Sequence, residues 1–288
     1  MKIQSKEENI RLDQYLAREL DISRSKIQKD IKEGLVKVNG KNVNSSFLLS
    51  IDDEIEITKR NSKPSTVEPL DIPLDVVYED EYLLVINKQS GLVVHPAPGH
   101  YTDTLVNALT NKFKLSNIDN ERPGIVHRID KDTSGLVLFA KSERVKNIMQ
   151  DNWDKVVRKY YAVVCGKLNG EGEVKQYLSE DKTLRVYVSD KGKLAITQYK
   201  CLKVSSVYSL MDVLIKTGRR NQIRVCFSSL GHPIIGDKKY GAKRNPIGRL
   251  GLHAYYLEFK HPVSSKNIVI EDEIPANFKV IFESATKK

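Results

Sequence analysis

The chain has 288 residues, of which 40% are hydrophobic and 29% are charged, and this balance indicates a folded rather than a disordered protein. Its formal net charge of +10 favours a polyanionic partner, with nucleic acid the first choice. No apolar run reaches the roughly 18 residues that a membrane helix needs, and the first residues lack the apolar core of a signal peptide. We therefore expect a cytoplasmic protein with no membrane partner.

The first 57 residues are predicted to form a small α+β unit of their own. Apolar side chains at helical spacing indicate a helix over residues 10–20. Ser23 is a good N-cap for a second helix, which Gly34 would end. A strand should follow over residues 35–38 and enter a tight turn at Asn39-Gly40, and a last short strand is expected over residues 54–57.

This order of elements resembles the S4 RNA-binding module. The resemblance covers residues 10–57 and rests on R-L-D-x-Y-L, S-R-S-x-I-x-x-x-I-x-x-G and V-x-V-N-G. In the S4 module the second helix faces RNA, which implies RNA contacts from four basic residues: Arg24, Lys26, Lys29 and Lys32. The alternative is an ordinary solvated helix face, and the acidic residues Asp30 and Glu33 share this helix.

Residues 58–70 are polar and contain two prolines, so they are predicted to be a linker. The remainder, residues 71–288, is rich in short apolar runs typical of strands, at residues 76–78, 83–86, 137–140, 160–165, 195–203 and 210–216. Helical patterns are fewer and fall at residues 104–112, 143–153 and 219–230. This pattern predicts an α+β domain built around a mixed, mostly antiparallel sheet.

Asp130 stands out because it lies between ordered segments. Turn-forming residues follow it and lead into an apolar strand at residues 136–140, so the carboxylate belongs to a loop, where catalytic groups are frequent. A loop carboxylate can be a nucleophile, a general base, a metal ligand or a turn cap. From position alone the turn cap is the commonest of these roles.

The sequence around Asp130 favours catalysis. H-R-I-D-K-D-T-S-G-L is similar to the H-R-L-D-x-x-T-S-G-L signature of the RluA-type pseudouridine synthases. In that family the aspartate of the signature is the essential catalytic carboxylate, so the resemblance implies this role for Asp130. It also places His127 and Arg128 beside the reacting group, where we expect them to contact RNA.

Two further segments imply partners for Asp130. Residues 159–166 resemble K-x-Y-x-A-x-V-x-G, from which we assign Tyr161 as the active-site tyrosine and leave Tyr160 to the core. Residues 217–225 resemble T-G-R-T-H-Q-I-R-V, which implies that Arg224 pairs with the catalytic aspartate and that Arg219 contacts RNA. In this segment Arg220 and Asn221 stand where threonine and histidine are usual.

The resemblance spans residues 74–262 and, with the S4-like module, points to the branch of ribosomal large-subunit pseudouridine synthase D. It implies an isomerase that converts uridine to pseudouridine in large-subunit ribosomal RNA or its precursor. No cofactor is implied. His95 and His100 share one loop without a third ligand, and the three cysteines form no C-x-x-C pair, so no metal is expected. We expect a monomer.

Two alternatives stay open. A synthase of the same family that acts on tRNA, or on both RNAs, would suit the departures at Arg220 and Asn221. An RNA-binding ribosome-assembly factor with little catalysis would suit the S4-like module, although Asp130, Tyr161 and Arg224 all being present favours an enzyme.

The reaction that the family catalyses explains the residue types. The uracil N1–C1′ bond breaks, the base rotates, and it rejoins the ribose through C5. Asp130 could attack C1′, abstract the 2′ proton or add to C6, and the sequence does not choose among these routes. We expect Arg224 to hold this carboxylate by a forked ion pair. The base must leave its stack, and an aromatic side chain such as Tyr161 would receive it.

Overall fold

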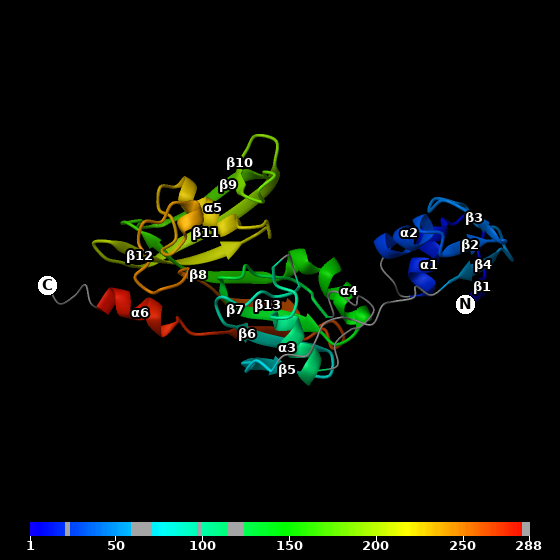
Figure 1. Cartoon of the computed structure of the whole chain (residues 1–288), viewed down its shortest axis with the longest axis horizontal. Helices are drawn as coiled ribbons and strands as arrows, with labels where there is room; N and C mark the ends of the chain where they lie inside the picture. The colour runs from blue at the N-terminus through cyan, green and yellow to red at the C-terminus, as the bar shows by residue number, and fades with distance from the viewer. Residues whose placement is uncertain (21–23, 59–70, 97–98, 114–123, 284–288) are drawn as a thin grey trace.

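The computed structural model describes residues 1–20, 24–58, 71–96, 99–113 and 124–283. At the N-terminus two helices, α1 (Leu12–Glu19) and α2 (Arg24–Lys32), pack on a four-stranded antiparallel sheet (Figure 1). Its strands follow the order β1-β4-β2-β3, and their bounds are β1 (Lys2–Gln4), β2 (Val36–Val38), β3 (Lys41–Asn42) and β4 (Glu54–Ile57).

This unit has a core of its own. Leu12 and Leu16 of α1, Ile27 of α2 and Ile55 of β4 are almost completely buried against one another. The helices and the strands at 36–38 and 54–57 lie where the apolar spacing predicted them, whereas β1 was not predicted. The N-cap expected at Ser23 lies outside the described residues. The division at residues 57 and 70 stays a prediction, since residues 59–70 are also outside them.

The rest of the described chain is organised around a ten-stranded sheet. Its order is β10-β9-β11-β12-β8-β13-β7-β6-β5, with β14 also paired to β13, and β13–β7 is the single parallel pair among the described strands. The bounds are β5 (Val76–Glu79), β6 (Leu83–Lys88), β7 (Ser134–Ala140), β8 (Val157–Cys165), β9 (Glu171–Glu180), β10 (Val186–Val188), β11 (Lys193–Val204), β12 (Tyr208–Ile215), β13 (Leu252–Lys260) and β14 (Asn267–Glu271). The predicted fold class, α+β with a mixed and mostly antiparallel sheet, is confirmed.

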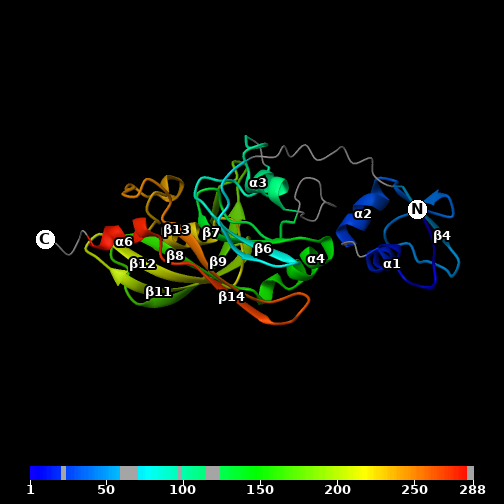
Figure 2. The same ribbon diagram turned by 90° about the horizontal axis from the view of Figure 1, so that it is seen from below.

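Helices cover parts of both faces of this sheet (Figures 1 and 2). The helix α4 (Glu143–Asp151) packs against β7, and α5 (Gln222–Ser229) packs against β9, β10 and β11. The last helix, α6 (Ala276–Glu283), buries Phe278 and Phe282 against Val163 of β8 and Tyr255 of β13. The helix α3 (Leu105–Lys112) begins at a capping box formed by Thr104.

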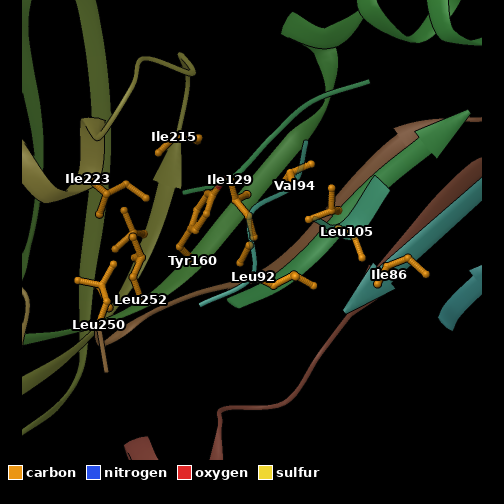
Figure 3. Packing of buried hydrophobic residues seen from close by; sticks show 14 of the residues in the cluster. Ile86, Leu92, Val94, Leu105, Ile129, Tyr160, Ile215, Ile223, Leu250 and Leu252 are labelled. Atoms are coloured by element: carbon orange, nitrogen blue, oxygen red, sulfur yellow. The ribbon is translucent and has the colours of Figure 1, made fainter. Parts of the chain in front are cut away.

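The largest core cluster lies directly beneath the segment that carries Asp130. Ile129 is buried in it together with Tyr160 of β8, Ile223 of α5 and Leu252 of β13 (Figure 3). The loop is therefore anchored by an apolar side chain one residue before the candidate carboxylate. No helix in the described part of the chain is long and apolar enough to span a membrane.

Candidate active site

The loop that carries Asp130 is tied to the end of β6. The ammonium of Lys88 donates to the carbonyl oxygen of Lys131 at 3.0 Å, and the amide of Gly91 donates to the same oxygen at 2.9 Å. Lys88 also donates to the carbonyls of Gln89 and Leu92, at 2.9 Å each. Burial lowers the pKa of Lys88 to about 7. These bonds hold the residue after Asp130 in place, so the backbone that carries the carboxylate is restrained.

The carboxylate of Asp130 receives two donors. Arg224 Nη1 donates to Oδ2 at 3.2 Å, and Asn221 Nδ2 donates to the same oxygen at 2.6 Å. The fork of the guanidinium, however, is directed at Asp237, with Nε to Oδ2 at 2.7 Å and Nη2 to Oδ1 at 2.8 Å. The predicted contact between Arg224 and Asp130 is present, but the expectation that the forked pairing falls on Asp130 is wrong.

The forked pairing of Arg224 falls on Asp237 because the chain segment after α5 brings this acid to the guanidinium. Asp237 is almost fully buried and lies at the start of the short helix η2 (Lys238–Tyr240). Although burial opposes it, the hydrogen bonds and charge of Asp237, followed by those of Asp130, raise the pKa of Arg224. Arg224 is thus permanently charged and held by Asp237, and it presents one remaining edge to Asp130.

Asn221 has a defined orientation. Its Oδ1 accepts from the hydroxyl of Tyr240 at 3.2 Å, which leaves Nδ2 to donate to Asp130. The backbone of Asn221 is left-handed, with φ 50°, a conformation that asparagine tolerates better than most residues. Because of this residue α5 begins at Gln222 rather than at Arg219 as predicted. Asn221, Asp237 and Tyr240 were not predicted as site residues.

A cavity of about 650 Å³ opens at Asp130. Asp130, Arg224 and Asn221 contribute to its wall, and its other walls come from the start of β8, the end of β12 and the loop before α5. The aromatic and cationic side chains along these walls are Trp153, Tyr160, Arg158, Lys216, Arg219 and Arg220. A chamber of this size accommodates a nucleoside.

The structure corrects the choice between the two neighbouring tyrosines. Tyr160 lines the cavity, whereas Tyr161 stacks on Tyr255 with the ring centroids 3.7 Å apart, in the cluster that α6 covers. Adjacent residues of a strand point to opposite faces, so one tyrosine at most can face the cavity. The motif contains a usable signal: counted back from Gly166, the spacing Y-x-A-x-V-x-G places its tyrosine at 160.

The electrostatics of Tyr160 agree with its position. Burial and the nearby negative charge of Asp130 raise the pKa of Tyr160 to about 12, although Arg158 acts in the opposite direction. The phenol is therefore neutral at physiological pH, and its ring forms one wall of the chamber that Asp130 faces.

His127 has a structural role that was not predicted. Its Nε2 accepts from the backbone amide of Leu138 at 3.0 Å, and its ring stacks on Trp153 with centroids 4.4 Å apart. Burial, aided by the charge of Arg158, lowers the pKa of His127 to about 3. The neutral imidazole also lines the cavity, so only the exposed part of the ring is available to RNA.

The other predicted RNA contacts near the motif are exposed at the cavity. Arg128 Nη1 lies 2.9 Å from His95 Nε2, and Arg219 Nε donates to the carbonyl of Leu194 at 2.9 Å. Both side chains line the chamber. Within the described residues no group of three or more His, Cys, Asp or Glu side chains is arranged to hold a metal ion.

Arg24 in α2 holds two helices together. Its Nε donates at 2.9 Å to Asp13 of α1, whose carboxylate is fully buried and also accepts from Arg11 and Gln28. Although burial opposes it, these hydrogen bonds lower the pKa of Asp13. Arg24 is thus first a structural residue, while about half of its side chain stays exposed.

The other basic residues of α2 keep their predicted role untested. Lys29 and Lys32 are exposed, and the side chain of Lys26 lies outside the described part of the structure. The predicted RNA-facing surface of α2 therefore rests on Lys29 and Lys32, with a partial contribution from Arg24.

Both parts of the chain are similar to known proteins. The sequence model of the RNA pseudouridylate synthase family matches residues 82–229, and that of the S4 domain matches residues 10–55. An uncharacterised RNA pseudouridine synthase of Aquifex aeolicus is 40% identical, and the alignment covers 98% of this chain and 95% of that protein. The ribosomal large subunit pseudouridine synthase D of Zymomonas mobilis is 37% identical, with 95% and 93% covered.

A solved structure shows the same fold. Human RNA pseudouridylate synthase domain containing 4 superimposes with a TM-score of 0.58, over 71% of this chain and 90% of that one, at 23% sequence identity.

Proposed function

Because this chain belongs to the RNA pseudouridylate synthase family and carries an S4 domain, we propose that it isomerises uridines of large-subunit ribosomal RNA with Asp130 as the catalytic carboxylate. Pseudouridine synthases are isomerases, so the protein is an RNA-modifying isomerase. The observation that carries the assignment of Asp130 is its position: the carboxylate meets Arg224 and Asn221 at the wall of a cavity that accommodates a nucleoside.

The hydrogen bonds of Asp130 distinguish its two oxygens. Among the described residues, both side-chain donors to this carboxylate reach Oδ2. We therefore assign the reaction to Oδ1. Attack on C1′, abstraction of the 2′ proton and addition to C6 each use one carboxylate oxygen as the reacting atom. The assignment of Oδ1 therefore applies to all three routes.

The reaction balances without any co-reactant. The N1–C1′ bond breaks and a C5–C1′ bond forms, while C5 loses a proton and N1 gains one. The chain must supply the carboxylate, hold the detached base and exclude water. Arg224, charged and fixed by Asp237, stabilises negative charge on Asp130 whenever the carboxylate is free between steps.

Tyr160 is the residue that we assign to the flipped base. A uridine in a stack cannot reach Asp130, and flipping costs a few kcal/mol of stacking and pairing. Stacking on an aromatic ring recovers about 1–3 kcal/mol per base. Tyr160 offers its ring at the cavity wall and belongs to the same buried cluster as Ile129.

Ribosomal RNA is the substrate that the relatives favour. Several proteins 34–39% identical to this chain are named ribosomal large subunit pseudouridine synthase D, and the net charge of +10 suits a large polyanion. Modification of tRNA, alone or in addition, is the alternative outcome of the test below.

The test is chemical mapping of pseudouridine in large-subunit ribosomal RNA and in tRNA after incubation with purified protein. Wild type should modify defined uridines of the ribosomal RNA, and Asp130→Asn should modify none while binding the RNA with similar affinity. Asp151→Asn, an exposed carboxylate at the end of α4, is the matched control and should behave as wild type. Equal modification by Asp130→Asn would reject the catalytic assignment, and modification of tRNA alone would reject the substrate.

A further inference from the structure

A second, smaller cavity shares Asp130 with the large one. It measures about 200 Å³, below the roughly 300 Å³ at the lower end of pockets for whole small molecules. Six residues belong to the walls of both cavities: Arg128, Ile129, Asp130, Arg220, Asn221 and Arg224. These residues therefore form the partition, and a nucleoside placed against Asp130 in the large cavity has the small one as its immediate neighbour.

The small cavity is rich in positive charge. Five cationic side chains line it, against the carboxylates of Asp130 and Asp132. Two of the five are already committed to acids, because Arg220 pairs with Glu180 and Arg224 with Asp237. The ammonium groups that a ligand can recruit are then those of Lys131 and Lys239.

Lys131 and Lys239 are suited to binding an anionic ligand. Lys131 Nζ lies 3.1 Å from the ring nitrogen Nε2 of His100, and Lys239 Nζ donates to the carbonyl of Leu184 at 3.1 Å. In the described part of the chain neither ammonium forms an ion pair with a carboxylate. Each is exposed and one or two residues from a group that holds the site, since Lys131 follows Asp130 and Lys239 follows Asp237 by two positions.

We propose that the small cavity binds a phosphodiester group that flanks the target uridine, with Lys239 and Lys131 as its ligands. The inference rests on the proposed function and deepens it. Covalent geometry requires a phosphate to be near: the phosphates on both sides of a ribose lie within one sugar length of C1′, and C1′ lies within two bonds of the atom that Asp130 approaches on each of the three routes. A phosphate held there fixes the ribose while the base is in the large cavity, and an ammonium recognises phosphate as a point charge.

The experiment measures binding to large-subunit ribosomal RNA transcript as a function of salt. Lys239→Gln and Lys131→Gln should each make the slope of log affinity against log salt less steep by about 0.7, as expected for one lost phosphate contact on a single strand. At low salt each should bind about tenfold more weakly, since a hydrogen bond to a charged group contributes about 1.5 kcal/mol. In turnover, KM should rise while kcat changes little.

Lys238→Gln is the matched control. Lys238 is exposed on the same short helix and loses the same formal charge, but it does not line the cavity. If Lys238→Gln changes the slope and the affinity as much as Lys239→Gln does, the effect is one of general surface charge and the proposed phosphate site is rejected. Equal melting temperatures of the three variants show that folding is unaffected.

A second arm locates the phosphate. RNA in which a neutral methylphosphonate replaces the linkage on one side of the modified uridine should bind wild type more weakly, and Lys239→Gln should add no further loss on one of the two sides. Independent, additive losses on both sides would overturn the proposal. An inactive wild type would reject the proposed function. The salt-slope comparison requires no conversion of uridine, so it decides the phosphate site separately.

Discussion

Asn221 Nδ2 donates a hydrogen bond of 2.6 Å to Oδ2 of Asp130, across 91 positions of the sequence. Two features make this bond specific. The hydroxyl of Tyr240 donates to the other end of the amide, and the left-handed backbone of Asn221 aims the side chain at the loop. Asn221 stands where the family signature usually has histidine, so this chain holds its candidate carboxylate with an amide that cannot titrate.

Removal of this amide should slow the chemical step. Asn221→Gly permits the left-handed backbone and deletes only the side chain, so kcat should fall about tenfold or more, because a hydrogen bond to a charged group contributes about 1.5–3 kcal/mol. Asn221→Asp should be less active still near neutral pH, since two carboxylates in contact repel, and it should regain activity as the pair takes up a proton at lower pH. Single-turnover rates from pH 5 to 8 test this, and matching pH profiles of both variants would contradict it.

The two tyrosines of β8 should differ in their effects. Tyr160→Leu removes the ring at the cavity and should reduce kcat/KM by about 5- to 150-fold, which corresponds to the 1–3 kcal/mol of one stacked base. Tyr160→Phe should retain most of the activity if stacking is the main role. Tyr161→Leu disrupts the stack with Tyr255 and should lower the melting temperature while the folded protein stays active. Loss of turnover in folded Tyr161→Leu, with Tyr160→Leu unaffected, would restore the original assignment.

His127 should make stability depend on pH in the acid range. Its pKa is lowered from 6.5 to about 3, so between these values the unfolded chain binds a proton that the folded chain does not. This contribution to stability is complete above pH 6.5 and is lost as pH falls towards 3, by about 1.4 kcal/mol per pH unit. The difference in unfolding free energy between wild type and His127→Gln, measured by urea titration, should therefore shrink as pH falls from 7 to 4. A constant difference would show that the folded imidazole is protonated there.

The ion-pair cluster at Asp13 should support the fold of the S4 domain. Asp13→Asn leaves Arg11 and Arg24 without their buried carboxylate and should cost about 2–3 kcal/mol, at or below the range for breaking a buried pair because both arginines are partly exposed. In thermal unfolding of the full chain, this cost appears as a lower temperature of the first unfolding transition. Lys29→Gln should leave that transition unchanged and weaken RNA binding. The reverse pattern, a stable Asp13→Asn and an unstable Lys29→Gln, would contradict these roles.

Much of the fold followed from local patterns. The apolar runs at 83–86 and 137–140 form the buried strands β6 and β7. They could be predicted because a strand covered on both faces is a nearly continuous apolar run in the sequence. The pattern missed the strands β9, β10, β13 and β14 and the helix α6. The residues of β9 and β10 are mixed in polarity, and these strands form by pairing with each other and with β11. β13 pairs with the distant strands β7 and β8, and α6 packs on a core cluster formed by distant segments. The start of α5 was predicted three residues early because no local sequence pattern predicts the left-handed backbone of Asn221.

By itself the sequence determined the family, the α+β class and the position of Asp130 on a loop after a signature motif, because these depend on residue identity and local spacing. The tertiary structure decided which tyrosine meets Asp130 and which acid takes the fork of Arg224. Tyr160 and Tyr161 differ only in the face of β8 on which they lie, and that face is chosen by the elements that pack on each side. Asp237 and Asn221 reach the site from beyond either end of α5, so their contacts exist only once the chain has folded.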